Sequence, residues 1–148
     1  MITFTTYKDG SSVNSAINPN IVSIAELHKE STLLKIWYHG HNRAVEYQQD
    51  QVKESLEKIY NRITGKSEQM IRFDIKRIND GKEKYRKIYL APKAIISFVR
   101  EPQQLRICFD KSKYQIRDLV LIEGYTKQLL DDIWQQLLDA KGIAESDV

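Results

Sequence analysis

The sequence has little of what builds disulfide frameworks, membrane spans or secretion signals. Among its 148 residues there is one cysteine, so no disulfide can form within the chain. No apolar run approaches the roughly 18 to 20 residues that a membrane-spanning helix needs. The opening segment "MITFTTYKDG" lacks the basic and apolar regions of a signal peptide. We therefore expect a cytoplasmic protein without a membrane partner.

Catalytic and cofactor-binding signatures are also absent. The sequence contains no G-x-S-x-G, no Walker loop, no dinucleotide-binding glycine fingerprint and no H-E-x-x-H. His39 and His41 could hold a metal together with Glu46, but "HGH" is better explained as an exposed hairpin turn. Cys108 stands in an alternating, strand-like run, which is typical of a packing residue. The sequence therefore predicts a non-enzymatic protein with no cofactor and no metal.

The composition is that of a folded domain. The chain is 41% hydrophobic and 29% charged, and its length suits one domain or two very small units that share a core. The formal net charge of +3 is unevenly distributed: residues 1–69 carry 8 basic and 8 acidic side chains, whereas residues 70–148 carry 15 basic and 12 acidic ones. All of the excess positive charge lies in the second half.

Short alternating segments separated by turn residues predict five strands in the first 48 residues. They are "ITFTTY", "SVNSAI", "IVSIAEL", "LLKIWY" and "RAVEYQ", and we expect them to form an antiparallel meander. From Asp50 the spacing changes, because Val52, Leu56 and Ile59 recur at helical intervals. This predicts an amphipathic helix over residues 51–63 with Asp50 as its N-cap.

The second half repeats this order of segments. "MIRFDIKRI", "YRKIYL", "AIISFVRE", "LRICF" and "YQIRDLVLI" precede a helix expected from Lys127 to Ala140. "INPNIVSIA" corresponds to "LAPKAIISFV", and the offset drifts from 69 to 74 only where turns are expected. We therefore predict an α+β fold of two tandem antiparallel β-meander-plus-helix repeats, packed as one pseudo-twofold domain. The repeats span residues 1–65 and 70–148, and residues 66–69 form a linker.

The last hairpin of each repeat predicts a difference in charge between the two copies. If "GH" and "KS" are two-residue turns, Lys35 faces Glu46 in the first repeat, whereas Arg106 faces Arg117 in the second. The same register predicts two core-facing pairs, Ile36 with Val45 and Ile107 with Ile116. Opposed arginines repel, so we expect an acidic group of the protein or an external anion beside them.

A basic segment with interleaved tyrosines marks the candidate ligand surface. Phosphate-neutralising charge beside stacking surface favours nucleic-acid binding, with single strands preferred. We expect Arg106 and Arg117 to share one sheet face with this segment, because strands one, four and five of the second repeat would be neighbours. The full set of candidate residues is Arg72, Lys76, Lys82, Lys84, Tyr85, Arg86, Lys87, Arg106 and Arg117.

Protein binding is the alternative function. A repeated sheet with exposed strand edges can pair with another chain or with a second copy, and lysine-rich hairpins are also used as solvated edges that prevent such pairing. Trp37 is the candidate anchor for a protein partner, whereas Trp134 is expected to pack on the sheet. The open partner classes are therefore a nucleic acid, another protein and a homo-oligomer.

Two family resemblances accompany these patterns. Residues 1–63 resemble the flagellar and swarming-motility proteins of the FlbD type in "YKDG", "INPNIVSI", "LLKIWYHG", "AVEY" and "VKESLEKI". That resemblance covers under half of the chain and implies no catalytic residues. The order of strands and helix, used twice, also resembles the Whirly and PUR-type single-strand nucleic-acid binders, whose sheet faces carry basic and aromatic residues. This second resemblance implies nucleic-acid binding.

Overall fold

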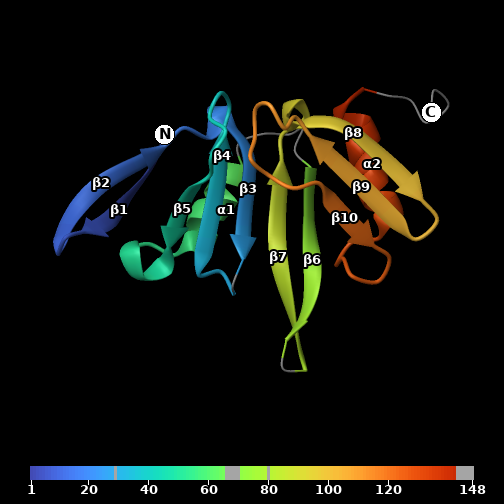
Figure 1. The fold of residues 1–148 in the computed structure, drawn as a ribbon. Coiled ribbons are helices and arrows are strands. Elements are labelled where there is room, and N and C mark those ends of the chain that lie inside the picture. The colour runs from blue at the N-terminus through green and yellow to red at the C-terminus, as the bar shows by residue number, and fades with distance from the viewer. Residues whose placement is uncertain (29, 66–70, 80, 143–148) are drawn as a thin grey trace.

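The computed structural model describes residues 1–28, 30–65, 71–79 and 81–142, which form ten strands, two α-helices and three 3-10 helices (Figure 1). The first half contains β1 (Ile2–Lys8), β2 (Ser11–Ile17), η1 (Pro19–Ile21), β3 (Val22–His28), β4 (Leu33–Tyr38), β5 (Val45–Gln48), η2 (Gln49–Gln51) and α1 (Leu56–Thr64). The second half contains β6 (Ile71–Asn79), β7 (Lys82–Leu90), η3 (Pro92–Ala94), β8 (Ile95–Glu101), β9 (Gln104–Phe109), β10 (Leu119–Ile122) and α2 (Leu130–Ala140). The linker expected at residues 66–69 lies outside the described residues.

The strands form three antiparallel sheets, which confirms the α+β class with antiparallel pairing. Their strand orders are β1-β2, β5-β4-β3-β7-β6 and β10-β9-β8. The single five-stranded meander expected in the first half is wrong, because β3 pairs with β4 and β7 and not with β2. Between β2 and β3 the chain turns through η1, which begins at Pro19. The proline ring fixes φ and removes a backbone donor, so the ladder cannot continue there.

The central sheet joins the two halves of the chain through β3 and β7. Their antiparallel register places Ala25 opposite Tyr89 and Glu26 opposite Ile88. Along the molecule, the β6–β7 hairpin stands between β3 and the β8-β9-β10 sheet (Figure 1). This junction pairs the third strand of the first half with the second strand of the second half. A pseudo-twofold axis would pair the same strand from each half, so the pseudo-twofold relation is not confirmed.

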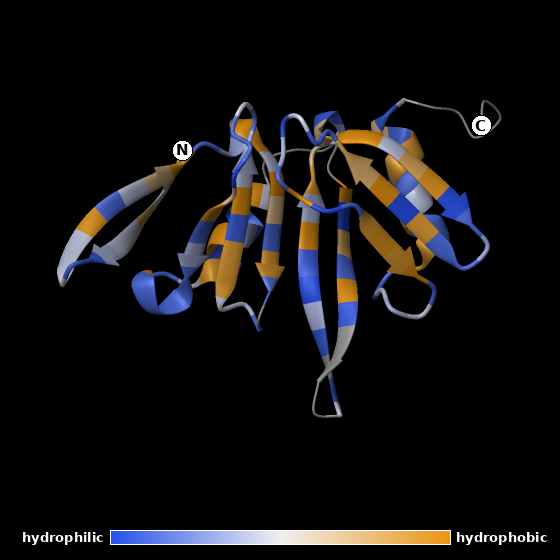
Figure 2. Cartoon of the chain, viewed as in Figure 1, coloured by the Kyte–Doolittle hydropathy of each residue, from blue (hydrophilic) through white to orange (hydrophobic). Residues whose placement is uncertain are grey.

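Two apolar clusters form the core, one beside each helix. The first contains side chains of β1 to β4 and α1, and the second contains side chains of β6 to β10 and α2. Tyr89 of β7 packs in the first cluster, whereas Ile24 of β3 and Trp37 of β4 pack in the second. Figure 2 shows hydrophobic residues alternating with hydrophilic ones along β6. The two halves are therefore interlocked across the β3–β7 junction.

Both helices begin later than their periodicity predicted. α1 begins at Leu56 with Ser55 as the N-cap, so the expected start at residue 51 and the expected cap Asp50 are wrong. Val52, which lies before the helix in the sequence, forms a β-bridge with Thr6 of β1. In the same way α2 begins at Leu130 and not at Lys127, because Thr126 forms a bridge with Ile75 of β6. In each half, the residues before the helix are used to cover a strand edge.

The hairpin register of the first half is confirmed. Lys35 faces Glu46, their side chains form an ion pair with 3.3 Å between Lys35 Nζ and Glu46 Oε1, and Ile36 faces Val45. Cross-strand pairs of opposite charge and of apolar type both favour this register.

The corresponding register of the second half differs from the prediction. Ile107 faces Leu119 and Arg106 faces Val120, so the expected pairs of Ile107 with Ile116 and Arg106 with Arg117 are wrong. The cause is Tyr114, which is 1% exposed and whose hydroxyl lies 2.9 Å from Ser23 Oγ of β3. Burial of this ring draws the chain away from the ladder, so a long loop replaces the two-residue turn.

Candidate functional site

The candidate nucleic-acid residues divide between two sheets. Those from Arg72 to Lys87 lie on the β6–β7 hairpin, whereas Arg106 lies on β9 and Arg117 lies in the loop before β10. β6 belongs to the five-stranded sheet, and β9 and β10 belong to the three-stranded one. The expected common sheet face is therefore wrong, because the β6–β7 hairpin pairs with β3 of the first half and not with the strands that follow it.

Three basic residues of the hairpin form ion pairs with the first half of the chain. Lys84 pairs with Glu30, and Arg86 of β7 pairs with Glu26 of β3. Lys87 pairs with Glu57 of α1, with 3.2 Å between Nζ and Oε1. The bond from Lys84 lowers the pKa of the Glu30 carboxyl below its ordinary value. These basic side chains are therefore used to hold the halves together.

The Glu26–Arg86 pair differs from the other two by its burial. Glu26 is 3% exposed, whereas the side chain of Glu30 is 61% exposed and that of Glu57 is 50% exposed. Breaking a buried pair leaves an uncompensated charge and costs on the order of 3–5 kcal/mol, whereas an exposed pair contributes about 0–1 kcal/mol. Sequence reasoning missed Glu26 and Glu57 because they come from segments far from the hairpin in the chain.

The remaining hairpin candidates have mixed surroundings. The Arg72 guanidinium donates to the Thr64 carbonyl at the end of α1. The Tyr85 ring is 37% exposed and lies below the Lys127 ammonium, with 5.8 Å from Nζ to the ring centroid. Lys82 is exposed at the hairpin turn and Lys76 is half-buried on β6. The hairpin therefore offers one exposed tyrosine and few basic groups outside ion pairs.

Arg106 and Arg117 are both exposed. Within the described part of the chain, neither arginine has a carboxylate within ion-pair distance. Asp118, which could have balanced them, pairs instead with Lys111 at 2.7 Å, and this bond lowers the pKa of the Asp118 carboxyl. Neither arginine therefore has an internal counter-charge among the described residues.

Trp37 does not present a surface for a protein partner. Its side chain is 5% exposed and packs in the second apolar cluster, among residues of the second half of the chain. Trp134 of α2 packs edge-on against Phe98 of β8, with 5.1 Å between ring centroids, in line with its expected place on the sheet.

Each β-hairpin has one outer edge that its own half closes. In the first, the Lys53 N–H donates to the Thr5 carbonyl at 3.0 Å, and the Thr5 N–H donates to the Glu54 carboxylate. In the second, the Lys127 N–H donates to the Asp74 carbonyl at 2.9 Å. The Asp74 N–H in turn donates to Gln128 Oε1. The edges of β1 and β6 are therefore protected from pairing with other chains.

The second strands of the two hairpins, β2 and β7, and the strand β8 differ in their pairing. β7 pairs with β3, but within the described ranges β2 pairs with β1 alone and β8 pairs with β9 alone. Val13 on β2 is 42% exposed, and Ile96 and Val99 on β8 are 64% and 48% exposed. The β1–β2 hairpin and the β8-β9-β10 sheet lie at opposite ends of the molecule (Figure 1). Unpaired edges with exposed apolar side chains are the features that strand-pairing partners recognise.

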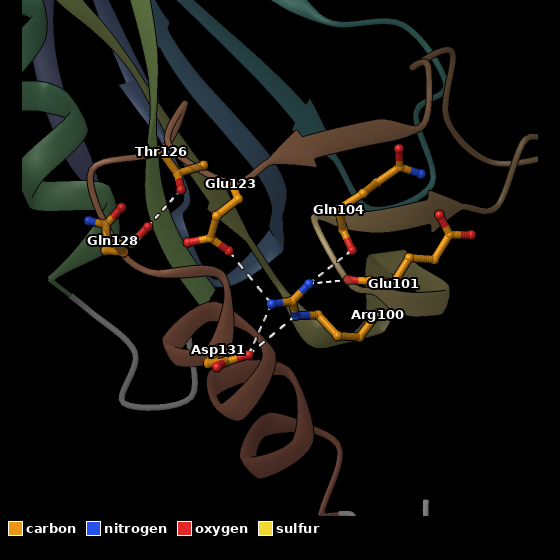
Figure 3. A network of polar contacts seen from close by, with 7 residues as sticks. All are labelled: Arg100, Glu101, Gln104, Glu123, Thr126, Gln128 and Asp131. Carbon is orange, nitrogen blue, oxygen red and sulfur yellow. Dashed lines mark hydrogen bonds and ion pairs between the residues drawn. The ribbon is translucent and has the colours of Figure 1, made fainter.

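The end of β8 is held in place by a polar network around Arg100 (Figure 3). The guanidinium lies 3.1 Å from the Asp131 carboxylate at the start of α2 and 3.6 Å from the Glu123 carboxylate. It also donates to the carbonyls of Glu101 and Gln104, which close the β8–β9 turn. β8 is therefore an ordered strand without a partner chain, and Arg100 attaches its end to α2.

Other classes of site find no support in the described residues. The described residues include no group of three His, Cys, Asp or Glu side chains that could hold a metal ion. None of their helices has the length and apolar character to cross a membrane. Among known proteins, no family model, no curated protein and no solved structure matches the chain. The open strand edges, which include those of β5 and β10, and the exposed basic residues remain as candidate surfaces.

Proposed function

We propose that this protein is a non-enzymatic interaction module that assembles with another protein chain through the edges of β2 and β8. The observation that carries the proposal is the contrast between three edges. The edge of β3 is covered by β7, whereas among the described strands β2 pairs only with β1 and β8 only with β9, and these two strands expose Val13, Ile96 and Val99. Strand addition supplies main-chain hydrogen bonds at such an edge, and the apolar side chains supply contact area.

The proposal includes the tandem organisation, with residues 1–65 and 70–148 as two copies of one unit. Each half runs hairpin, 3-10 turn, three strands and α-helix. The pairing register also shifts at corresponding points, between Val22 and Ile24 in β3 and between Ile95 and Ser97 in β8. A shared irregularity at a constant offset supports descent from one duplicated unit, arranged head to tail.

The proposed function is tested by making the two edges unsuitable for strand pairing. Tagged wild-type chain and a tagged Val13→Lys/Val99→Lys variant are incubated with cell extract, and the bound proteins are quantified by mass spectrometry. We expect the variant to lose the specific partners, because lysine on an edge strand opposes pairing. Leu129→Lys is the matched control, since Leu129 is 63% exposed and lies outside the strands. Equal capture by wild type and edge variant would reject the proposal.

Nucleic-acid binding through the β6–β7 hairpin, Arg106 and Arg117 is the second candidate, with single strands preferred. It is favoured by the two exposed arginines and by the sequence pI of about 8.9. It is weakened by the ion pairs of Lys84, Arg86 and Lys87, since a phosphate would have to displace their carboxylates. A gel shift with single- and double-stranded oligonucleotides at about 50 mM salt tests it, because counterion release makes affinity strongest there. An absence of binding in that buffer rejects this candidate.

A further inference from the structure

We propose that the protein partner is a second copy of this chain, and that β2 of one copy pairs antiparallel with β8 of the next. The inference rests on the proposed function, because it names the occupant of the same two edges. Its model is the junction within the chain, where β7 of the second half pairs with β3 of the first. A second copy bound at the β8 edge would place its β2 against β8 in the same way that β7 lies against β3 within the chain.

The two free strands occupy the positions of the two paired ones. In the first hairpin Ile2 faces Ile17, and in the second Ile71 faces Leu90. β2 and β7 are each followed by a 3-10 turn that begins with proline. β8 and β3 share the register shift described above and pair on the other side with β9 and β4. β2 therefore corresponds to β7, and β8 corresponds to β3.

The register of the proposed junction follows from this correspondence. Within the chain, β3 and β7 pair Ile24 with Leu90, Ala25 with Tyr89, Glu26 with Ile88 and Leu27 with Lys87. The corresponding pairs between copies are Ser97 with Ile17, Phe98 with Ala16, Val99 with Ser15 and Arg100 with Asn14. Each of these pairs is sterically and chemically compatible in an antiparallel ladder.

The sizes of the paired side chains are exchanged between the two junctions. Within the chain, the small Ala25 lies opposite the large Tyr89, which is 3% exposed. Between copies, the large Phe98 would lie opposite the small Ala16. Packed interfaces tolerate changes that conserve total volume. The exchange keeps the summed volume of this pair of positions close to that of Ala25 and Tyr89.

The ion pair of the junction within the chain is replaced by two apolar residues at the proposed junction between copies. The buried ion pair of Glu26 and Arg86 crosses the β3–β7 junction. The corresponding residues of the free strands are Val99 and Val13, which are 48% and 42% exposed in the separate chain. A buried ion pair can be replaced by apolar residues with little loss or with a gain in stability. The two valines would cover each other when the strands meet.

Such a junction is heterologous, because it joins different surfaces of the two copies. The β2 and β8 edges lie at opposite ends of the molecule (Figure 1), so a bound copy leaves one edge of each kind free. Heterologous contacts continue into a filament unless the rotation between copies closes a ring. We therefore expect assemblies larger than a dimer that grow with protein concentration.

The first test is the mass of the purified full chain, measured by analytical ultracentrifugation over a wide range of concentration. Wild type should associate beyond the dimer. Val13→Glu and Val99→Arg should each weaken association at least about tenfold, because the first places a carboxylate opposite Glu101 and the second an unpaired charge opposite Ser15. Both side chains are exposed in the free chain, so circular dichroism and melting temperature should stay unchanged. Association that neither variant weakens would overturn the register.

The second test is a mixture of the two variants. At one kind of contact the guanidinium introduced at position 99 meets the carboxylate introduced at position 13, which is the Glu26–Arg86 pair with its charges exchanged; the other kind is wild type. Association should return in the mixture of Val13→Glu with Val99→Arg. It should not return in the control mixture of Val13→Glu with Val99→Glu, where like charges meet.

The outcomes separate this inference from the proposed function. A wild-type chain that stays monomeric while its edges capture other proteins overturns self-pairing and leaves the interaction module intact. A monomeric chain whose edge variants also change no capture overturns both. Association that appears only when single-stranded DNA is added overturns the inference too, since the junction needs no nucleic acid.

Discussion

The edge of β3 and the edge of β8 occupy corresponding positions in the two halves, yet one is buried and the other is open. On β3, Glu26 is covered by the β6–β7 hairpin and pairs with Arg86. On β8, Val99 has no strand beside it and is 48% exposed. The covered edge is specified by charge, and the open one presents apolar surface. Under the proposed duplication, one copy of the unit uses this edge for folding, and the other copy leaves the equivalent edge for the proposed assembly.

The largest expected effect comes from breaking the ion pair of the covered edge. Glu26→Gln leaves the Arg86 guanidinium partly buried without a counter-charge, which should reduce the free energy of unfolding by on the order of 3–5 kcal/mol. Urea denaturation followed by circular dichroism measures the change. Glu57→Gln is the control, because Glu57 forms an exposed pair with Lys87 and should cost less than about 1 kcal/mol. Equal losses in both variants would contradict the contrast in burial.

A somewhat smaller effect is expected from the aromatic residues of the two edges. Tyr89→Ala should destabilise the chain by about 3 kcal/mol, because the ring is 3% exposed and leaves a cavity in the first apolar cluster. Phe98→Ala should cost roughly 1 kcal/mol in the separate chain, because Phe98 is half-buried against Trp134. Thermal unfolding of dilute protein measures both. A larger loss for Phe98→Ala would indicate that β8 is already covered.

Sequence reasoning predicted the elements better than the contacts between them. The register of Lys35 with Glu46 was predictable, because cross-strand pairs of opposite charge and of apolar type favour it locally. The register of β9 with β10, in which Arg106 faces Val120 and not the predicted Arg117, was not predictable, because Tyr114 is buried against Ser23 of the other half. Such contacts join segments far apart in the chain, and periodicity carries no information about them.

The candidate site was predictable in kind but not in place. Exposed strand edges were an expected alternative, yet which edges remain open depends on the β3–β7 pairing. The same pairing gives Arg86 a carboxylate partner on β3 and brings Lys87 beside Glu57 of α1. The exposed Val13 and Val99 carried no signal in the sequence, because valine in a strand is ordinary core composition.

A near-neutral result is expected when the covered edge is given the chemistry of the open one. Glu26→Val combined with Arg86→Val reproduces at the β3–β7 junction the two valines of β8 and β2. Replacement of a buried ion pair by apolar residues removes the cost of desolvating both charges, so stability should change by less than about 1 kcal/mol. Urea denaturation of the double variant, compared with both single variants, gives the coupling energy. A double variant as unstable as Glu26→Gln would show that the covered edge tolerates no apolar pair, which would weaken the correspondence with β8.

The smallest expected effect is a pH dependence at the exposed end of the covered edge. The bond from Lys84 lowers the pKa of Glu30 in the folded chain, so the unfolded state binds more protons in the acidic range. The contribution of this pair is therefore present above the ordinary pKa of glutamate and is lost as the pH falls through the lowered value. Lys84→Gln removes the cause of the shift, so its stability should differ from wild type near neutral pH and approach it in acid. Because Glu30 lies at the surface, salt should reduce the difference further. Melting temperatures of the two chains across that range, at low and high salt, measure it. A difference that grows in acid would contradict the assigned ion pair.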